Sequence, residues 1–505
     1  MSISVNDRPA MPPSRDHRVR PAVSAAACLL IAGCAVGPNF HRPAPPTLDR
    51  YSAQPGPARL EADGAVQIIA PGRPTDPAWW RLFGSTALDD LVAEGLKSSP
   101  TLAAARAALS ESRDQARAGA GVFFPQISAE ANALRERFAP AEEGDRGAPS
   151  TFDLYTLTGR ISYMVDLFGG ERRNVEALVA AADHQRYAVG AAYLALTGNV
   201  VDAAIARAGY AEEAEALREI ARLDADQRDV LVAQFKAGYG AWSNVLVAEQ
   251  QLDTDRESLA AALQRQAAST TLLQALLGRE VGAQGPPAPS LDDLTVPEAA
   301  PVSLPSQIVR ERPDILQAEA ALHQASAQVG VATAALFPSI SITGNYGDAS
   351  LSLGKLGSPQ GVFWGIGPSV NVPIFQGGQL WYARKAAQAA FLESEANYRQ
   401  TVLAALEQVA DSLKALDTDA AISGANRGAF EAARGDVSLA EANRQAGVIA
   451  DYDAMTLEIQ AGRARLGLIA AKSQRLQDVV GLYLASGGGW NAAGQGGGAM
   501  AASSK

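Results

Sequence analysis

The chain contains the same set of motifs twice, and this duplication limits what it can fold into. Four short motifs recur in the same order, 207 to 213 residues apart. The matched segments are 100–102 with 313–315, 124–128 with 337–341, 168–170 with 375–378, and 237–238 with 446–447. A nearly constant period indicates a duplicated structural unit. We therefore predict two repeats, over 88–280 and 304–487, instead of several unrelated globular domains.

Three segments outside the repeats have a different composition. Residues 34–87 are rich in proline, and a second proline-rich stretch, 281–303, links the two repeats. Residues 488–505 consist mostly of glycine, alanine and serine, a composition that is typical of a flexible tail.

Each repeat contains one very long helical segment. No proline occurs between Gly170 and Pro286, which predicts a helix over 172–236 of about 65 residues and about 97 Å. The chain breaks at Gly238 and Gly240, and a second helix follows over 243–277. The combined length of this second helix and an alanine-rich helix over 101–121 is nearly that of the long helix. The match predicts antiparallel helical columns, in which two shorter helices stack end to end beside one long helix. A long coiled-coil spacer is the alternative interpretation.

Each repeat also contains a pair of strands in which apolar and polar residues alternate. We predict strands over about 126–135 and 153–167 in the first repeat and over about 339–348 and 362–375 in the second. Their length suits a tilted transmembrane strand, although an ordinary half-buried sheet would show the same alternation. Four strands cannot close a barrel in lipid without leaving open edges. Closure therefore needs several chains, and three chains would supply twelve strands.

The N-terminus has the features of an export signal. Arg15, Arg18 and Arg20 precede a short apolar stretch that ends at Gly33-Cys34, which predicts a signal peptide over 1–33. The residues around Cys34 resemble a bacterial lipobox. Cleavage between Gly33 and Cys34 would leave Cys34 carrying a diacylglycerol and an N-acyl chain such as palmitate, and an ordinary signal peptide is the alternative. Translation could begin at Met1 or at Met11. No later segment has 18 consecutive apolar residues, which argues against a helical membrane protein.

Composition excludes several function classes. The net charge of −11 disfavours binding to nucleic acid, because neutralising phosphates requires a basic face. Two Cys and four His provide no metal site of recognisable spacing. There is no phosphate-binding loop, no nucleophile elbow and no metalloprotease motif. We therefore expect no catalytic residues, no metal and no cofactor apart from the lipid on Cys34.

Taken together, the order of elements resembles the TolC/OprM-like outer membrane factor family, and more narrowly its NodT-type efflux lipoproteins. The matching stretches are 34–43, 79–83, 304–306, 312–315, 318–319, 337–340 and 487–490. The resemblance implies a mainly α-helical homotrimer with a twelve-stranded β-barrel in outer membrane lipid. It also implies a twelve-helix periplasmic α-barrel and an equatorial belt formed partly by 34–87 and 281–303. The implied partners are a periplasmic adaptor and an inner-membrane resistance–nodulation–division pump.

The resemblance also implies a gate at the periplasmic helix ends. Gly238, Gly240 and Gly447 would form the tip turns, and Asp453 matches the position whose carboxylates ring the closed pore. Arg444 and Asn244 match further positions of the tip network. Thr456 and Asn244 stand where the family often has Asp, which makes the strength of the closed gate an open question. A solvated helix start is the simpler interpretation of Asp453.

The expected function is that of an exit duct in a tripartite efflux system. It would passively conduct small molecules such as drugs or metal ions from the pump to the exterior. A type I protein secretion channel and a structural coiled-coil lipoprotein are the alternatives. The sequence indicates neither the substrate nor which pump and adaptor serve it.

Overall fold

A computed structural model describes residues 35–490 except 49, 53–58, 63–64, 74, 140–143, 145 and 283–286. The predicted signal peptide, Gly33, Cys34 and most of the predicted tail lie outside the described residues, so predictions about them stay predictions. The described chain divides into two compact units.

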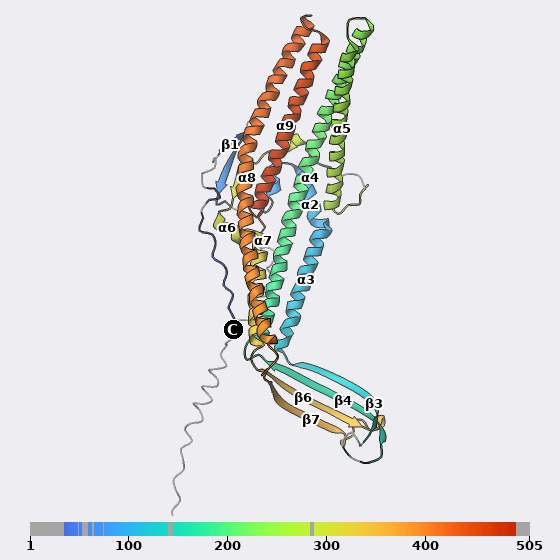
Figure 1. Ribbon diagram of the computed structural model, residues 1–505, viewed down its shortest axis with the longest axis vertical. Coiled ribbons are helices and arrows are strands. Elements are labelled where there is room, and N and C mark those ends of the chain that lie inside the picture. Colours follow the sequence, from blue (N-terminus) through green and yellow to red (C-terminus); the bar gives the residue numbers. More distant parts are fainter. Residues whose placement is uncertain are drawn as a thin grey trace, which may run out of the picture. The chain divides into compact units, whose positions relative to one another are not determined.

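The first unit contains residues 116–178 and 324–391, together with the segment that ends at Phe40. Its centre is a four-stranded antiparallel sheet in the order β3-β4-β6-β7 (Figure 1). The strands are β3 (Gln126–Phe138), β4 (Ser150–Val165), β6 (Ser339–Ser350) and β7 (Val362–Asn371). Pairing of β4 with β6 joins the two repeats in one sheet, and β3 and β7 are its edges.

The register of the sheet collects the apolar residues on one face. Gly159 pairs with Tyr346, and Tyr346 pairs with Trp364. Since paired residues share a face, the apolar positions predicted in β4, β6 and β7 form one surface. This surface is open to solvent in the single chain, with Tyr346 64% and Trp364 73% exposed. Thr158, Asn345 and Ser369 belong to the opposite, polar face.

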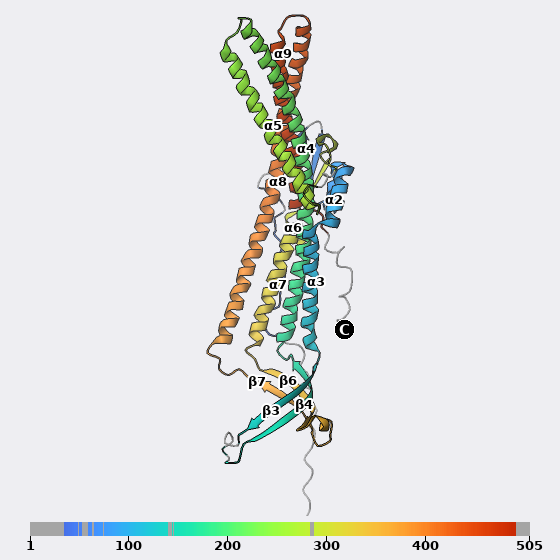
Figure 2. The same ribbon diagram turned by 90° about the vertical axis from the view of Figure 1, so that its right-hand side faces the viewer.

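The second unit contains residues 41–115, 179–323 and the chain beyond Leu392. It is built mainly from helices, and several of them continue into the first unit (Figures 1 and 2). The helices are α3 (Pro100–Ala120), α4 (Gly170–Lys236), α5 (Trp242–Leu276), α7 (Pro313–Ala334), α8 (Gln379–Gln445) and α9 (Asp451–Ala485). Helices α4 and α8 have 67 residues each, and α5 and α9 have 35 each. The equal lengths bear out the duplication predicted from the motifs.

The shorter helices stack end to end, as the length comparison predicts. At the end of α5, the carbonyl of Leu277 accepts a hydrogen bond from the Ser98 hydroxyl at 2.6 Å, directly before α3. At the end of α9, the carbonyl of Ala485 accepts from the Arg312 guanidinium at 2.9 Å, directly before α7. Each junction thus satisfies a carbonyl that a helix terminus would otherwise leave unpaired.

The proline-rich segments contain regular structure that the sequence analysis did not predict. Strands β1 (Arg59–Ala62), β2 (Ala65–Pro71) and β5 (Ala299–Val302) form a small sheet, and β5 comes from the inter-repeat linker. Two helices were also missed, α2 (Thr86–Ser98) and α6 (Pro305–Glu311). These elements are short, and β2 pairs with a strand some 230 residues away, so local periodicity gives no signal for them.

One described helix, α4, has an apolar stretch long enough to cross a bilayer, although the sequence has no uninterrupted apolar run of that length. In the structure 61% of this stretch is buried, which fits packing against neighbouring helices.

Candidate functional site: the helix ends at Gly238 and Gly447

The two predicted tip turns have the same backbone geometry. Gly238 and Gly447 have φ angles of 85° and 71°, a left-handed conformation that favours glycine at the end of a helix. The following amides close equivalent bonds, from Tyr239 to the Gln234 carbonyl at 2.9 Å and from Val448 to the Asn443 carbonyl at 2.8 Å. Both turns lie at the same end of the helical unit (Figures 1 and 2).

The first turn exposes aromatic side chains. Tyr239 is 88% exposed, and the rings of Phe235 and Trp242 contact each other with centroids 5.1 Å apart. Gly240 lies between these residues without a positive φ, and a Cβ at this position would stand 3.5 Å from Phe235. The geometry here therefore tolerates a side chain, unlike that at Gly238.

Arg444 forms ion pairs with acidic residues on both sides of the second turn, within the same helical hairpin. Its guanidinium contacts both carboxylate oxygens of Glu441 at 2.9 Å and reaches Asp451 at 3.3 Å. The hydrogen bonds from Arg444 lower the pKa of Glu441 to about 2. Arg444 thus links the last turn of α8 to the first turn of α9 across Gly447.

Asp453 and Asn244 are both exposed, in the first turns of α9 and α5. Within the described part of the chain, neither forms a side-chain hydrogen bond or ion pair with Arg444. A single chain therefore does not assemble the three gate positions, and their joint role stays a prediction that requires neighbouring chains.

Gln227 joins the repeats near the tips, and the sequence analysis did not identify it. Its side-chain amide donates to the Thr456 hydroxyl at 2.7 Å and to the Tyr452 carbonyl at 3.1 Å. The Thr456 hydroxyl also donates to the Tyr452 carbonyl at 3.0 Å. These bonds connect α4 of the first repeat to the first turn of α9, beside Asp453. Thr456 is thus part of a polar link, although it lacks the charge often found at that position.

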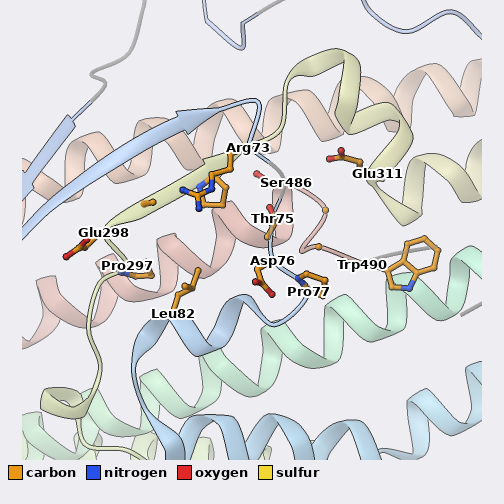
Figure 3. A pocket seen from close by; sticks show the side chains of 14 residues that line it. Arg73, Thr75, Asp76, Pro77, Leu82, Pro297, Glu298, Glu311, Ser486 and Trp490 are labelled. Atoms are coloured by element: carbon orange, nitrogen blue, oxygen red, sulfur yellow. The ribbon is translucent and has the colours of Figure 1, made fainter. Parts of the chain in front are cut away.

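A cavity of about 800 Å³ lies elsewhere in the helical unit, beyond the C-terminal end of α9 (Figure 3). Arg73, Asp76 and Ser486 line it, together with residues of the linker. The tips precede the start of α9, so the cavity lies at the other end of that helix and is separate from the predicted gate. Among the described residues, no group of three or more His, Cys, Asp or Glu could hold a metal ion.

Comparisons with known proteins agree with the duplicated architecture. The family model described as outer membrane efflux protein matches residues 91–279 and 304–488, one match in each repeat. The probable efflux pump outer membrane protein TtgC of Pseudomonas putida is 27% identical over 467 residues, which cover 92% of this chain and 95% of that protein. Nodulation protein T of Rhizobium leguminosarum is 27% identical over 474 residues, 92% of each chain.

Among solved structures, the Campylobacter jejuni CmeC outer membrane channel superposes with a TM-score of 0.80 at 20% identity. The match covers 90% of this chain and 95% of that one, and at this identity it shows the shared fold. The family predicted from the motifs is thus confirmed by a match that includes most of both repeats. The chain belongs to the outer membrane efflux protein family.

Proposed function

We propose that this protein is the outer membrane exit duct of a tripartite efflux system. It conducts small molecules passively from a periplasmic adaptor and an inner-membrane pump to the exterior. The observation that carries this proposal is one chain with two very long helical hairpins and a four-stranded sheet that has an open apolar face. The role of a structural coiled-coil spacer does not require a sheet with an open apolar face.

The open edges of the sheet support a homotrimer. Strands β3 and β7 leave backbone groups unpaired in a single chain, and lipid does not tolerate unpaired edges. Edge-to-edge pairing of three chains would give the twelve-stranded barrel that the sequence predicts. The helical hairpins of three chains would likewise form the twelve-helix α-barrel, with β1, β2 and β5 in its equatorial belt.

The packing of the first described residues supports a lipid anchor at Cys34. Ala35 lies against Gly169, and the amide of Val36 donates to the Phe168 carbonyl at 3.0 Å. The first described residue, Ala35, therefore lies next to the residues that follow β4, and Cys34 directly precedes it in the sequence. Mass spectrometry of the purified protein tests the anchor: we expect an acylated Cys34, with no acylation in Cys34→Ser.

The tip turns are the expected contact of the adaptor, and the exposed Tyr239 and Trp242 provide apolar surface there. Asp453 would line the closed pore in three copies, where its field favours cations. A periplasmic adaptor and a resistance–nodulation–division type pump supply specificity and energy, since the described site has no catalytic constellation.

A deletion strain of the native host tests the proposal. Loss of this gene should raise the intracellular accumulation of ethidium or increase sensitivity to one class of drugs or metal ions, and the wild-type gene should restore export. If ethidium accumulation and sensitivity to drugs and metal ions stay unchanged while a protein disappears from the culture medium, the type I secretion channel would be favoured.

A further inference from the structure

Two pairs of carboxyl groups, three of them buried and Asp478 half-buried, lie between the long helices, away from the tips. The first pair is Asp224 on α4 and Asp255 on α5, which are 4% and 8% exposed. The second is Asp419 on α8, which is 8% exposed, and Asp478 on α9. The gate predicted from the sequence uses neither pair.

The positive charge around the first pair is too small to stabilise two ionised carboxylates. Asp255 accepts a hydrogen bond from Gln251 at 2.8 Å and lies 3.3 Å from the Arg463 guanidinium of α9. Arg463 is itself half-exposed. The Asp255 carboxyl lies close enough to Asp224 to raise its pKa, and Oδ2 of Asp224 is buried without a hydrogen-bond donor among the described residues. Two carboxyl groups can share a hydrogen bond only when one of them is protonated.

Apolar residues lie near this pair on the same helices. Leu217 and Ala262 pack with Leu466, and Leu223, next to Asp224 in the sequence, packs with Ile459. A second charge in such surroundings is costly unless it is paired.

The second pair repeats the arrangement with one more acid. Asp478 lies close enough to Asp419 to raise its pKa, and Oδ2 of Asp419 is buried without a hydrogen-bond donor among the described residues. Asp478 also accepts from Gln474 at 3.1 Å, and Asp202 of α4 faces it. Three carboxyl groups from α4, α8 and α9 thus lie near one another, and Arg475, which is 1% exposed, acts on Asp419.

We propose that each pair retains one proton while the helices are packed, so that the contacts of α4 with α5, and of α4 and α8 with α9, form a proton-dependent seam. The seam is defined by Asp202, Asp224, Asp255, Asp419, Asp478, Arg463 and Arg475. Loss of the protons adds a buried negative charge to each pair and loosens the packing.

The expected direction of the titration follows from the environment. Burial and the neighbouring carboxyl raise the pKa of Asp224 and that of Asp419 to about 7. Burial also acts on Asp255, but the bonds from Asp224, Gln251 and Arg463 outweigh it, and the pKa of Asp255 lies below its usual value. Burial and Asp478 raise the pKa of Asp202 to about 7.

Because these pKa values are raised, the packed state binds more protons than a loosened state in which the acids are hydrated. The preference for packing is therefore fully present in acid, and it is lost as the pH rises from the usual aspartate value of about 4 to about 7. Asp224 lies three residues before Gln227, and Arg463 lies seven residues after Thr456, so the seam continues into the tip link. A coupling to channel opening rests on the proposed function.

The test measures single-channel open probability in planar bilayers between about pH 5.5 and about pH 8. We expect a rise of about tenfold in the wild type, the size that one proton gives over one pH unit. Combining Asp202→Asn, Asp224→Asn and Asp419→Asn should abolish the rise and keep the low open probability, because an amide can donate a hydrogen bond without ionising. Two neighbouring carboxylates that are not buried provide the control: Asp226→Asn with Asp417→Asn should behave like the wild type.

A pH-independent wild type, or an unchanged rise in the Asn variant, would overturn the proposal. Infrared spectroscopy of the wild-type protein provides a second readout that needs neither conduction nor a variant. We expect a carbonyl band of protonated carboxylic acid at about pH 5.5 that disappears by about pH 8, and its absence at the lower pH would also overturn the proposal. A wild type that conducts at no pH, but shows this band, would contradict the channel function and leave the seam supported.

Discussion

The rings of Phe168 and Phe337 stack with centroids 4.8 Å apart and an interplanar angle of 23°. Phe168 follows β4 of the first repeat, and Phe337 precedes β6 of the second, so this stack joins the repeats beside the pairing of those two strands. The duplicated motifs place Phe375 in the position of Phe168 and Phe124 in the position of Phe337. Both of these rings are exposed in the single chain, by 88% and 68%.

We predict that Phe375 stacks on Phe124 of the next chain in the trimer. Phe375→Ala should weaken each contact between chains by about 1–3 kcal/mol, because it removes a buried aromatic pair. The temperature at which the proposed trimer dissociates on a non-denaturing gel measures the effect. Tyr239→Ala is the control, since Tyr239 is equally exposed but lies in a tip turn. Equal dissociation temperatures for both variants would exclude the stack.

Arg312 should be essential for the junction between α7 and α9. It is 7% exposed and bonds the Ala485 carbonyl, Asp314 and the Gln408 side chain. Arg312→Ala leaves a buried carbonyl unpaired, so we expect a loss of about 2–3 kcal/mol of stability. Thermal unfolding followed by circular dichroism checks this, with the exposed Arg310→Ala as a variant expected to have little effect. A melting temperature no lower than that of Arg310→Ala would contradict the assignment.

The link from Gln227 to Thr456 should stabilise the closed tips. Thr456→Val keeps the shape of the side chain but removes its hydroxyl, and we expect open probability to rise by about two- to tenfold, the effect of one hydrogen bond. Adding Gln227→Ala should give less than the sum of the two separate effects, because both changes remove the bond between these side chains, although each also removes one bond to the Tyr452 carbonyl. Thr456→Ser retains the hydroxyl and should resemble the wild type. Additive effects of the two changes would show that the residues act separately.

The ion pair between Arg444 and Glu441 should be lost only in strong acid, when Glu441 is protonated. Since the pKa of Glu441 is lowered to about 2, its contribution is fully present above the ordinary value of about 4.5 and is lost as the pH falls towards 2. Hydrogen exchange at the amides of 446–449 should therefore stay slow at neutral pH. Arg444→Gln should accelerate it, whereas Arg434→Gln, farther along α8, should not. Equal exchange in both variants would show that the pair does not hold the turn.

The sequence predicted those parts of the fold that depend on local periodicity and on repetition. The long helices, the strand pairs and the glycine turns at Gly238 and Gly447 all leave such signals. The strand bounds differ by a few residues: β4 ends at Val165 before Phe168, and β7 ends at Asn371 where Pro373 interrupts the alternation.

The remaining features depend on contacts between distant residues. Gln227 has no distinctive neighbours in sequence, and its partner Thr456 lies 229 residues away. Asp224 and Asp419 occur in helices with many other acids, and only packing shows that these two are buried. In the proposed trimer, the relation of Asp453 and Asn244 to Arg444 would involve neighbouring chains, so neither the sequence nor one chain determines it.

Ion conduction in planar bilayers tests the central claim, a channel closed by three copies of one chain, most directly. The purified wild-type protein should give discrete conductance steps, with a reversal potential in a salt gradient that indicates a preference for cations. Asp453→Ala should conduct with a weaker cation preference, because it removes the charge expected to ring the pore. Wild-type protein that inserts into the bilayer without any conductance would contradict the account.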